Sequence, residues 1–128
     1  MTDTNPMRLP LGDPSFFEDL SNRSGVVITR ELISSAPLSV RKELVQIATA
    51  LKNRDSAELQ SICHALKGAC YSMQAHRLAY FVREMELVSS DIGKSEILYE
   101  TVLSVGEETI SWWRYILLHA DYLKSPDE

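Results

Sequence analysis

Apolar residues recur at spacings of three and four along most of the chain, which is the pattern of amphipathic helices. Four such stretches, separated by short polar connections, cover about residues 39–52, 55–73, 76–88 and 95–123. We find no convincing strand between them. The pattern therefore predicts an all-α protein, an up-down antiparallel four-helix bundle.

The chain before the bundle predicts a tail and one short helix. Residues 1–14 contain prolines and a glycine but no apolar period, so we expect a flexible N-terminal tail there. Residues 15–20 carry two phenylalanines and a leucine, which indicates a short N-terminal helix that caps one end of the bundle. The expected domain spans residues 15–123, with a C-terminal tail over 124–128, and 128 residues suit a single core.

Proline and capping residues set the expected limits of the first long helix. Val26–Ile28 favours a strand by propensity but has no evident partner, so we interpret it as a buried linker. Thr29 is the expected N-cap of a helical segment that Pro37 breaks or kinks, because proline lacks a backbone donor and clashes with the preceding turn. The helix is then expected to resume at Ser39.

Two later helices have their own start signals. Asp55 and Glu58 resemble a capping box at the start of the second bundle helix. Ser95 is the expected cap of the long last helix. The apolar stripe of that helix places Trp112 in the core and Trp113 at its margin.

The helix predicted over residues 55–73 has one apolar face and one unusual polar face. A step of roughly 100° per residue gathers its apolar residues into one inward stripe: Leu59, Ile62, Cys63, Leu66, Ala69, Cys70 and Met73. His64 lies opposite that stripe and is expected to be solvated. The same outward face carries Gln60, Ser61, Lys67, Gly68 and Tyr71.

Gly68 follows His64 by one turn, inside a helix, where glycine costs about 1 kcal/mol relative to alanine. No helix end is indicated there, so the missing side chain is expected to leave room beside His64. The run His-Ala-Leu-Lys-Gly-Ala over residues 64–69 resembles the signature of histidine-containing phosphotransfer (HPt) domains, which is His-x-Leu-Lys-Gly followed by small residues. The resemblance implies a four-helix bundle whose His64 carries a phosphoryl group.

The resemblance also implies roles around the histidine. A neutral imidazole is a good nucleophile near neutral pH, and the phosphoryl group that it accepts brings roughly two negative charges. Lys67 is expected to stabilise that charge, and Gly68 to leave space for the active-site loop of a partner. Gln60, one turn before His64, is a candidate hydrogen-bond donor to a phosphoryl oxygen.

An ordinary solvated surface is the alternative for these polar residues. It remains open for Lys67, and it is the favoured interpretation of Gln60. Ser61 and Tyr71 complete the candidate binding face, where Tyr71 either contacts a partner or covers the neighbouring helix.

The remaining histidines and the cysteines are given structural roles. His76 lies near a turn as a capping or surface residue, and His119 lies at the edge of the last apolar stripe. Cys63 and Cys70 point inward while His64 points outward, so these side chains cannot converge on a metal ion and no metal site is expected. Two buried, unpaired cysteines suit a reducing compartment.

The resemblance implies partners rather than a cofactor. In HPt relays the aspartate and a divalent metal belong to the partner receiver domain, so no cofactor is expected on this chain. The expected partners are response-regulator receiver domains and a hybrid sensor histidine kinase, in a multistep phosphorelay. The chain is thus expected to be a phosphocarrier and not an enzyme. The alternative is a helical interaction module that binds a receiver or kinase without phosphotransfer.

Composition excludes several other classes. A net charge of −5 and the lack of a Lys/Arg run argue against nucleic-acid binding. No apolar run approaches the ~20 residues that span a bilayer, and the N-terminus lacks the layout of a signal peptide. We expect a cytoplasmic monomer without a membrane segment. One position departs from the HPt pattern: glycine is common in the turn about ten residues past the histidine, where this chain has Gln74.

Overall fold

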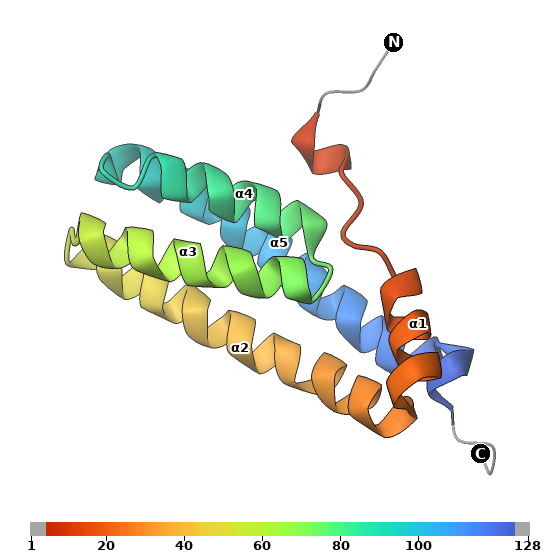
Figure 1. The fold of residues 1–128 in the computed structure, drawn as a ribbon. Helices are drawn as coiled ribbons and strands as arrows, with labels where there is room; N and C mark the ends of the chain where they lie inside the picture. Colours follow the sequence, from red (N-terminus) through yellow and green to blue (C-terminus); the bar gives the residue numbers. More distant parts are fainter. Residues whose placement is uncertain (1–4, 125–128) are drawn as a thin grey trace.

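The computed structural model describes residues 5–124, and within them helices account for nearly all of the regular structure (Figure 1). The α-helices are α1 (Ser15–Ser24), α2 (Val26–Lys52), α3 (Ser56–Ser72), α4 (His76–Leu87) and α5 (Ile92–His119). Short 3₁₀ helices precede and follow them, over Pro6–Arg8 and Asp121–Leu123. None of the helices in this part of the chain is long and apolar enough to cross a membrane.

Helices α2 to α5 pack side by side in chain order, and α5 returns to lie against α2. The connections between them are short, so consecutive helices run in opposite directions. Helix α1 lies across the end of the bundle where α2 begins and α5 ends, as Figure 1 shows. The predicted all-α bundle with a short N-terminal helix is therefore confirmed.

The core contains the inward stripes of all four long helices, with Trp113 as its largest fully buried side chain. The indole Nε1 of Trp113 donates a hydrogen bond to the carbonyl of Met73 at 3.3 Å, which ties α5 to the end of α3. The prediction that Trp112 is central and Trp113 marginal is wrong, since Trp112 is only partly buried. The buried positions of α5 near its end are Thr109, Ile110, Trp113 and Ile116, and this spacing centres the stripe on residue 113.

Helix α2 is one continuous helix, which corrects three expectations. Residues Val26–Ile28 form its first turn after Gly25 and are not a buried linker, because Val27 and Ile28 are exposed. Thr29 does not cap the helix but lies within it, and its hydroxyl donates to the carbonyl of Gly25 at 2.9 Å. The helix also passes through Pro37, which is buried, and does not break there. We attribute this to packing along 27 residues, which outweighs one lost backbone hydrogen bond.

The starts of α3 and α5 are both capped by aspartate. The carboxylate of Asp55 accepts the backbone N–H of Glu58 at 3.1 Å, which confirms the predicted cap of α3. In α5 the cap is Asp91, which accepts the N–H of Lys94 at 3.1 Å, and the predicted cap at Ser95 is wrong. Ser95 is instead buried, and its hydroxyl is 3.0 Å from the carbonyl of Val88, to which it donates.

The turn between α3 and α4 depends on a left-handed residue, Gln74, with a φ of 60°. The N–H of Ala75 donates to the carbonyl of Cys70 at 2.8 Å, and the N–H of Gln74 donates to that of Tyr71 at 3.3 Å. These two bonds form the Schellman motif that commonly ends helices. The turn thus adopts the conformation that glycine favours, although glutamine occupies it.

Part of the expected N-terminal tail lies against the bundle. Arg77 donates from Nε to the carbonyl of Leu9 at 2.8 Å, and Gly12 forms an isolated β-bridge with Ala75. A side chain at Gly12 would collide with the carbonyl of Gln74 and with the indole of a neighbouring tryptophan. Residues 1–4 and 125–128 of the two expected tails lie outside the described residues, and the division into tail, bundle and tail stays a prediction.

Substituting Gln74→Gly should stabilise the protein. The substitution removes the steric cost of the left-handed conformation, about 1 kcal/mol, and the side-chain contacts that it loses are exposed. Thermal and urea denaturation would measure the change. Ser72→Gly is the matched control because Ser72, the last residue of α3, has a helical backbone, and there glycine should lower the stability by about 0.5 kcal/mol. Equal effects of the two glycines would contradict the role of the turn.

Candidate functional site

His64 lies in the middle of α3, and its side chain is exposed, as the sequence predicts. Its side chain is 73% exposed, while Cys63 beside it is fully buried. Gly68, one turn further along, has open space where a side chain would begin, with no atom within 4 Å. The imidazole therefore stands on an outward helix face that offers room on its C-terminal side.

A residue that the sequence analysis missed, Glu86 of α4, holds this histidine. One carboxylate oxygen, Oε1, lies 2.9 Å from Nδ1 of His64. The other, Oε2, accepts a hydrogen bond from Nζ of Lys67 at 2.7 Å. Glu86 thus bridges the two functional candidates of α3, and its own side chain is only 14% exposed.

The charge of Glu86 is stabilised by these two partners. The hydrogen bond from Lys67 is the main cause that lowers the pKa of the carboxyl below its ordinary value, and the hydrogen bond with His64 lowers it further, against the opposing effect of partial burial. Glu86 is therefore a carboxylate, which can only accept. Nδ1 of His64 must then carry the proton in this hydrogen bond, and Nε2 is left as the free nitrogen.

The hairpin of α3 and α4 contains a signal that would have found Glu86. His64 lies ten residues before Gln74 and Glu86 lies twelve residues after it. In antiparallel helices that rise about 1.5 Å per residue, two residues at similar distances from the turn lie at the same level. Glu86 also follows the inward residue Val82 by one turn, which places it at the edge of the buried stripe facing α3.

The other candidates of the outward face lie in different positions. Gln60 and Ser61 line a shallow hollow of about 300 Å³ together with His64 and Glu86. Tyr71 lies further along α3, 52% exposed, and does not line this hollow. A group bound at Nε2 would therefore have Gln60 and Ser61 on one side and open space at Gly68 on the other.

The remaining histidines are away from the site. His76 lies with its Nε2 3.1 Å from the side-chain oxygen of Gln74 in the α3–α4 turn. His119, in the last turn of α5, packs against Tyr115 with ring centroids 4.5 Å apart and the ring planes tilted by 41°. Neither histidine contacts His64, so the structure brings together one histidine, one lysine and one carboxylate.

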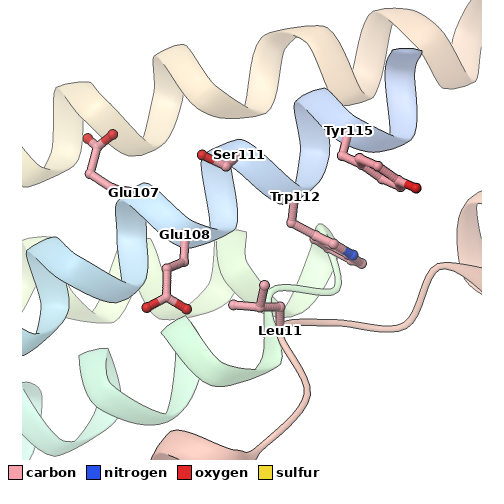
Figure 2. A pocket seen from close by; sticks show the side chains of 6 residues that line it. All are labelled: Leu11, Glu107, Glu108, Ser111, Trp112 and Tyr115. Atoms are coloured by element: carbon pink, nitrogen blue, oxygen red, sulfur yellow. The ribbon is translucent and has the colours of Figure 1, made fainter. Parts of the chain in front are cut away.

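A wider hollow of about 510 Å³ lies between the N-terminal segment and α5 (Figure 2). In that view Leu11 lies beneath the indole of Trp112, with Glu108 on the same side of α5. The carboxylate of Glu108 is already engaged, 2.8 Å from Nη1 of Arg77. The hollow contains no part of the His64 cluster and is not included in the candidate site.

Comparison with known proteins finds a family model and a solved structure that are similar to this chain. A model of the Hpt domain family matches residues 38–107, which is more than half of the chain and includes His64, Lys67 and Glu86. The crystal structure of histidine-containing phosphotransfer protein B (HptB) from Pseudomonas aeruginosa PAO1 has a similar fold, with a TM-score of 0.76. The two sequences are 20% identical, and the match covers 82% of this chain and 92% of that one. No protein with a curated description matches the chain.

Both thiols should be protected from alkylation in the folded protein. Burial raises the pKa of Cys70 to about 12, and burial together with the charge of Glu86 raises the pKa of Cys63 to about 12. Near pH 8 only about one thiol in ten thousand would then be the reactive thiolate. We expect iodoacetamide to label the native protein at least about a hundredfold more slowly than the protein unfolded in guanidinium chloride. Variants with one cysteine each, Cys63→Ser and Cys70→Ser, separate the two sites. A thiol that reacts equally fast in both states would contradict its burial.

Proposed function

The chain belongs to the Hpt domain family, and from this premise we propose that His64 accepts a phosphoryl group from the aspartate of a receiver domain and passes it to a second receiver domain. The chain would then be an intermediate in a multistep two-component phosphorelay. The observation that carries the proposal is the exposed imidazole whose Nδ1 is engaged by Glu86 while Nε2 is free.

The proposed step is a direct transfer between the two proteins. The lone pair of Nε2 attacks the phosphorus of the aspartyl phosphate and forms an N–P bond. The P–O bond to the partner aspartate breaks, and its electron pair returns to the partner carboxylate. Passing the group on reverses the same exchange with another receiver domain, so this chain acts as a phosphocarrier and the partner supplies the chemistry.

Two residues of α3 are assigned supporting roles. Lys67 is 25% exposed and one turn from His64, so its ammonium group can move from Glu86 toward a phosphoryl oxygen on Nε2. Gly68 leaves space through which the active-site loop of a receiver domain, with its divalent metal, reaches the imidazole. Gln60 and Ser61 border the other side of the hollow and are assigned to contacts with the phosphoryl group or the partner. Tyr71, exposed further along α3, is assigned to the partner surface.

The partners proposed are response-regulator receiver domains and a hybrid sensor histidine kinase. We propose that the chain works in the cytoplasm, because its two buried, unpaired thiols suit a reducing compartment. We also propose that it works as a monomer that does not bind nucleic acid, since its net charge is −5. A second candidate function is a helical module that binds a receiver or kinase without accepting phosphate. The outward face of α3 suits both functions, and a phosphorylation assay separates them.

His64→Gln should abolish phosphoryl acceptance while leaving the helical fold intact, because His64 is exposed and its core neighbours are untouched. The assay would incubate the protein with phosphorylated receiver domains and score acid-labile, base-stable label on this chain. His76→Gln and His119→Gln are the matched controls and should keep full acceptance. Label that persists on His64→Gln would overturn the assignment, and no label on the unaltered chain would favour the binding module.

Substitutions at Gly68 should separate partner access from histidine chemistry. Gly68→Ala should raise the stability by about 1 kcal/mol, because the position is open and alanine is the better helix former. Gly68→Gln should slow transfer from a receiver domain about tenfold or more, since in-line transfer tolerates little displacement of the reacting atoms. It should hardly change phosphorylation by phosphoramidate, a small donor that needs no docking.

The two donors would be compared on the same Gly68 variants. If the larger side chain slows both donors equally, the glycine serves the geometry of the imidazole and the docking role is wrong. If neither rate changes, Gly68 has no role in access.

A further inference from the structure

The segment before α1, residues 5–13, lies against the start of α4 and against α5, and we call it the strap. One guanidinium group connects the three segments. Nε of Arg77 in α4 donates to the carbonyl of Leu9 at 2.8 Å, and Nη1 of the same side chain lies 2.8 Å from the carboxylate of Glu108 in α5. The side chain of Arg77 is only 16% exposed, so the strap is tied to a largely covered ion pair.

The strap meets the bundle at a helix start that has no capping side chain. Helices α3 and α5 each follow an aspartate whose carboxylate accepts a backbone N–H of the first turn, whereas Ala75, which precedes α4, makes no such bond. Gly12 of the strap forms its β-bridge with this same Ala75. A side chain at Gly12 would collide with the carbonyl of Gln74 and with the indole of Trp112. The strap therefore supports the α3–α4 turn from outside, at the place where a cap is missing.

The strap buries little of itself. None of the residues 5–13 is buried, and the side chains of Met7 and Leu9 are exposed. Hollows of about 510 Å³ and about 460 Å³ lie on either side of it, the first lined by Leu11 and the second by Pro6. Segments with few buried contacts open at a much smaller free-energy cost than the core of a domain. The docked strap is therefore expected to exchange with a released state while the bundle stays folded.

We propose that the strap is a conformational switch for the His64 cluster. When it is docked it holds the start of α4 and keeps Glu86 against His64, and when it is released the α3–α4 hairpin loosens and this contact is broken more often. The inference concerns the arrangement of the cluster and goes beyond the proposed function. Its consequence for phosphoryl acceptance rests on that function.

The dimensions of α4 connect its start to the site. With 12 residues it is the shortest of the helices α2 to α5, and Glu86 lies in its last turn, about 15 Å along the axis from His76. A helix of this length is marginal by itself, so its position depends on its packing and on its two ends. A shift of α4 along α3 by about 1 Å would lengthen the 2.9 Å contact between Glu86 and His64 beyond hydrogen-bonding distance.

The switch would be operated by any molecule that prefers one of the two states of the strap. A partner that binds residues 5–13 only when they are released shifts the equilibrium toward the loosened hairpin, by no more than its preference for that state. The coupling is reciprocal, so a ligand that holds Glu86 against His64 favours the docked strap.

The test uses two substitutions in the full chain that release the strap by different means. Gly12→Ala places a methyl group against the α3–α4 turn, and Leu11→Ser removes the apolar side chain that lies beneath the indole of Trp112 (Figure 2). Heteronuclear ¹H–¹⁵N NOE values of the strap should fall in both variants. Amide hydrogens of α4, such as that of Ala79, should exchange about tenfold faster relative to those of α2, as expected for the loss of one or two net hydrogen bonds.

The ¹⁵N spectrum of the His64 ring reports on the cluster without any phosphoryl group. Nδ1 carries the proton while Glu86 accepts from it, and without that hydrogen bond the proton is shared between the two ring nitrogens. Near pH 8 we expect the Nδ1-protonated form in the unaltered chain and a mixture in both strap variants. Phosphorylation by phosphoramidate should slow in proportion to the fraction of the Nδ1-protonated form that is lost.

Gly93→Ala is the matched control, because it makes the same substitution in the first turn of α5, where the added carbon meets Asp91 at an ordinary 3.5 Å. Its α4 exchange and its His64 spectrum should equal those of the unaltered chain. A similar change in Gly93→Ala would show that the effect is not specific to the strap and would overturn the proposal.

The remaining outcomes also decide the question. A strap that stays rigid in both variants, or α4 exchange that stays unchanged when the strap is released, would overturn the switch. So would an effect confined to Gly12→Ala, which would come from the collision with the turn itself. Faster exchange with an unaltered His64 spectrum would overturn the link to the site. If the unaltered chain accepts no phosphoryl group, the proposed function fails, and the exchange and ring spectra still decide the switch.

Discussion

The left-handed turn at Gln74 sets the register between α3 and α4, and that register decides which side chain meets His64. The Schellman hydrogen bonds fix where α3 ends, and α4 begins at His76, two residues after Gln74. A shift of one residue would rotate the α4 positions by about 100° and carry Glu86 away from the imidazole. The other end of α3 is fixed in the same way by Arg54, whose φ is 53°. The functional helix is thus held at both of its ends by residues in a conformation that side chains disfavour.

The cluster of His64, Glu86 and Lys67 is also coupled electrostatically. Partial burial opposes the charge of Glu86, and its hydrogen bonds with Lys67 and His64 outweigh that opposition, so the pKa of the carboxyl lies below its ordinary value of 4.5. At pH values above that ordinary pKa, its interactions therefore stabilise the folded protein. This stabilisation is lost as the pH falls through the lower pKa of the folded state. Near neutral pH the carboxylate is fully charged. The cluster is then already assembled in the protein alone, and in the proposed transfer only the free nitrogen and the lysine would have to respond.

Helical period alone predicted the features of the site that lie on one helix. The outward position of His64, the inward cysteines and the space at Gly68 all follow from a single wheel over α3. Glu86 could not be found in that way, because its contact depends on the relative position of two helices. The burial of the two adjacent tryptophans was predicted the wrong way round, because apolar stripes drawn through Trp112 and through Trp113 have the same spacing. The hydrogen bond from Trp113 to the carbonyl of Met73 distinguishes the two in the structure. Pro37 was expected to break or kink a helix because local rules do not include the tertiary contacts of α2.

The outward face of α3 is free to serve a partner because the helix is held from other directions. Its inward stripe is buried, its start is capped by Asp55, and its end is tied to α5 through Trp113 and Met73. None of these contacts involves Gly68 or His64. The contact of His64 with the rest of the bundle is its hydrogen bond with Glu86 of α4. A helix so anchored can carry an interior glycine and an exposed histidine at a cost of about 1 kcal/mol without losing its position. The precision that the proposed phosphoryl transfer at Nε2 would demand is therefore supplied by the far side of the helix and by its two turns, while the near side stays open.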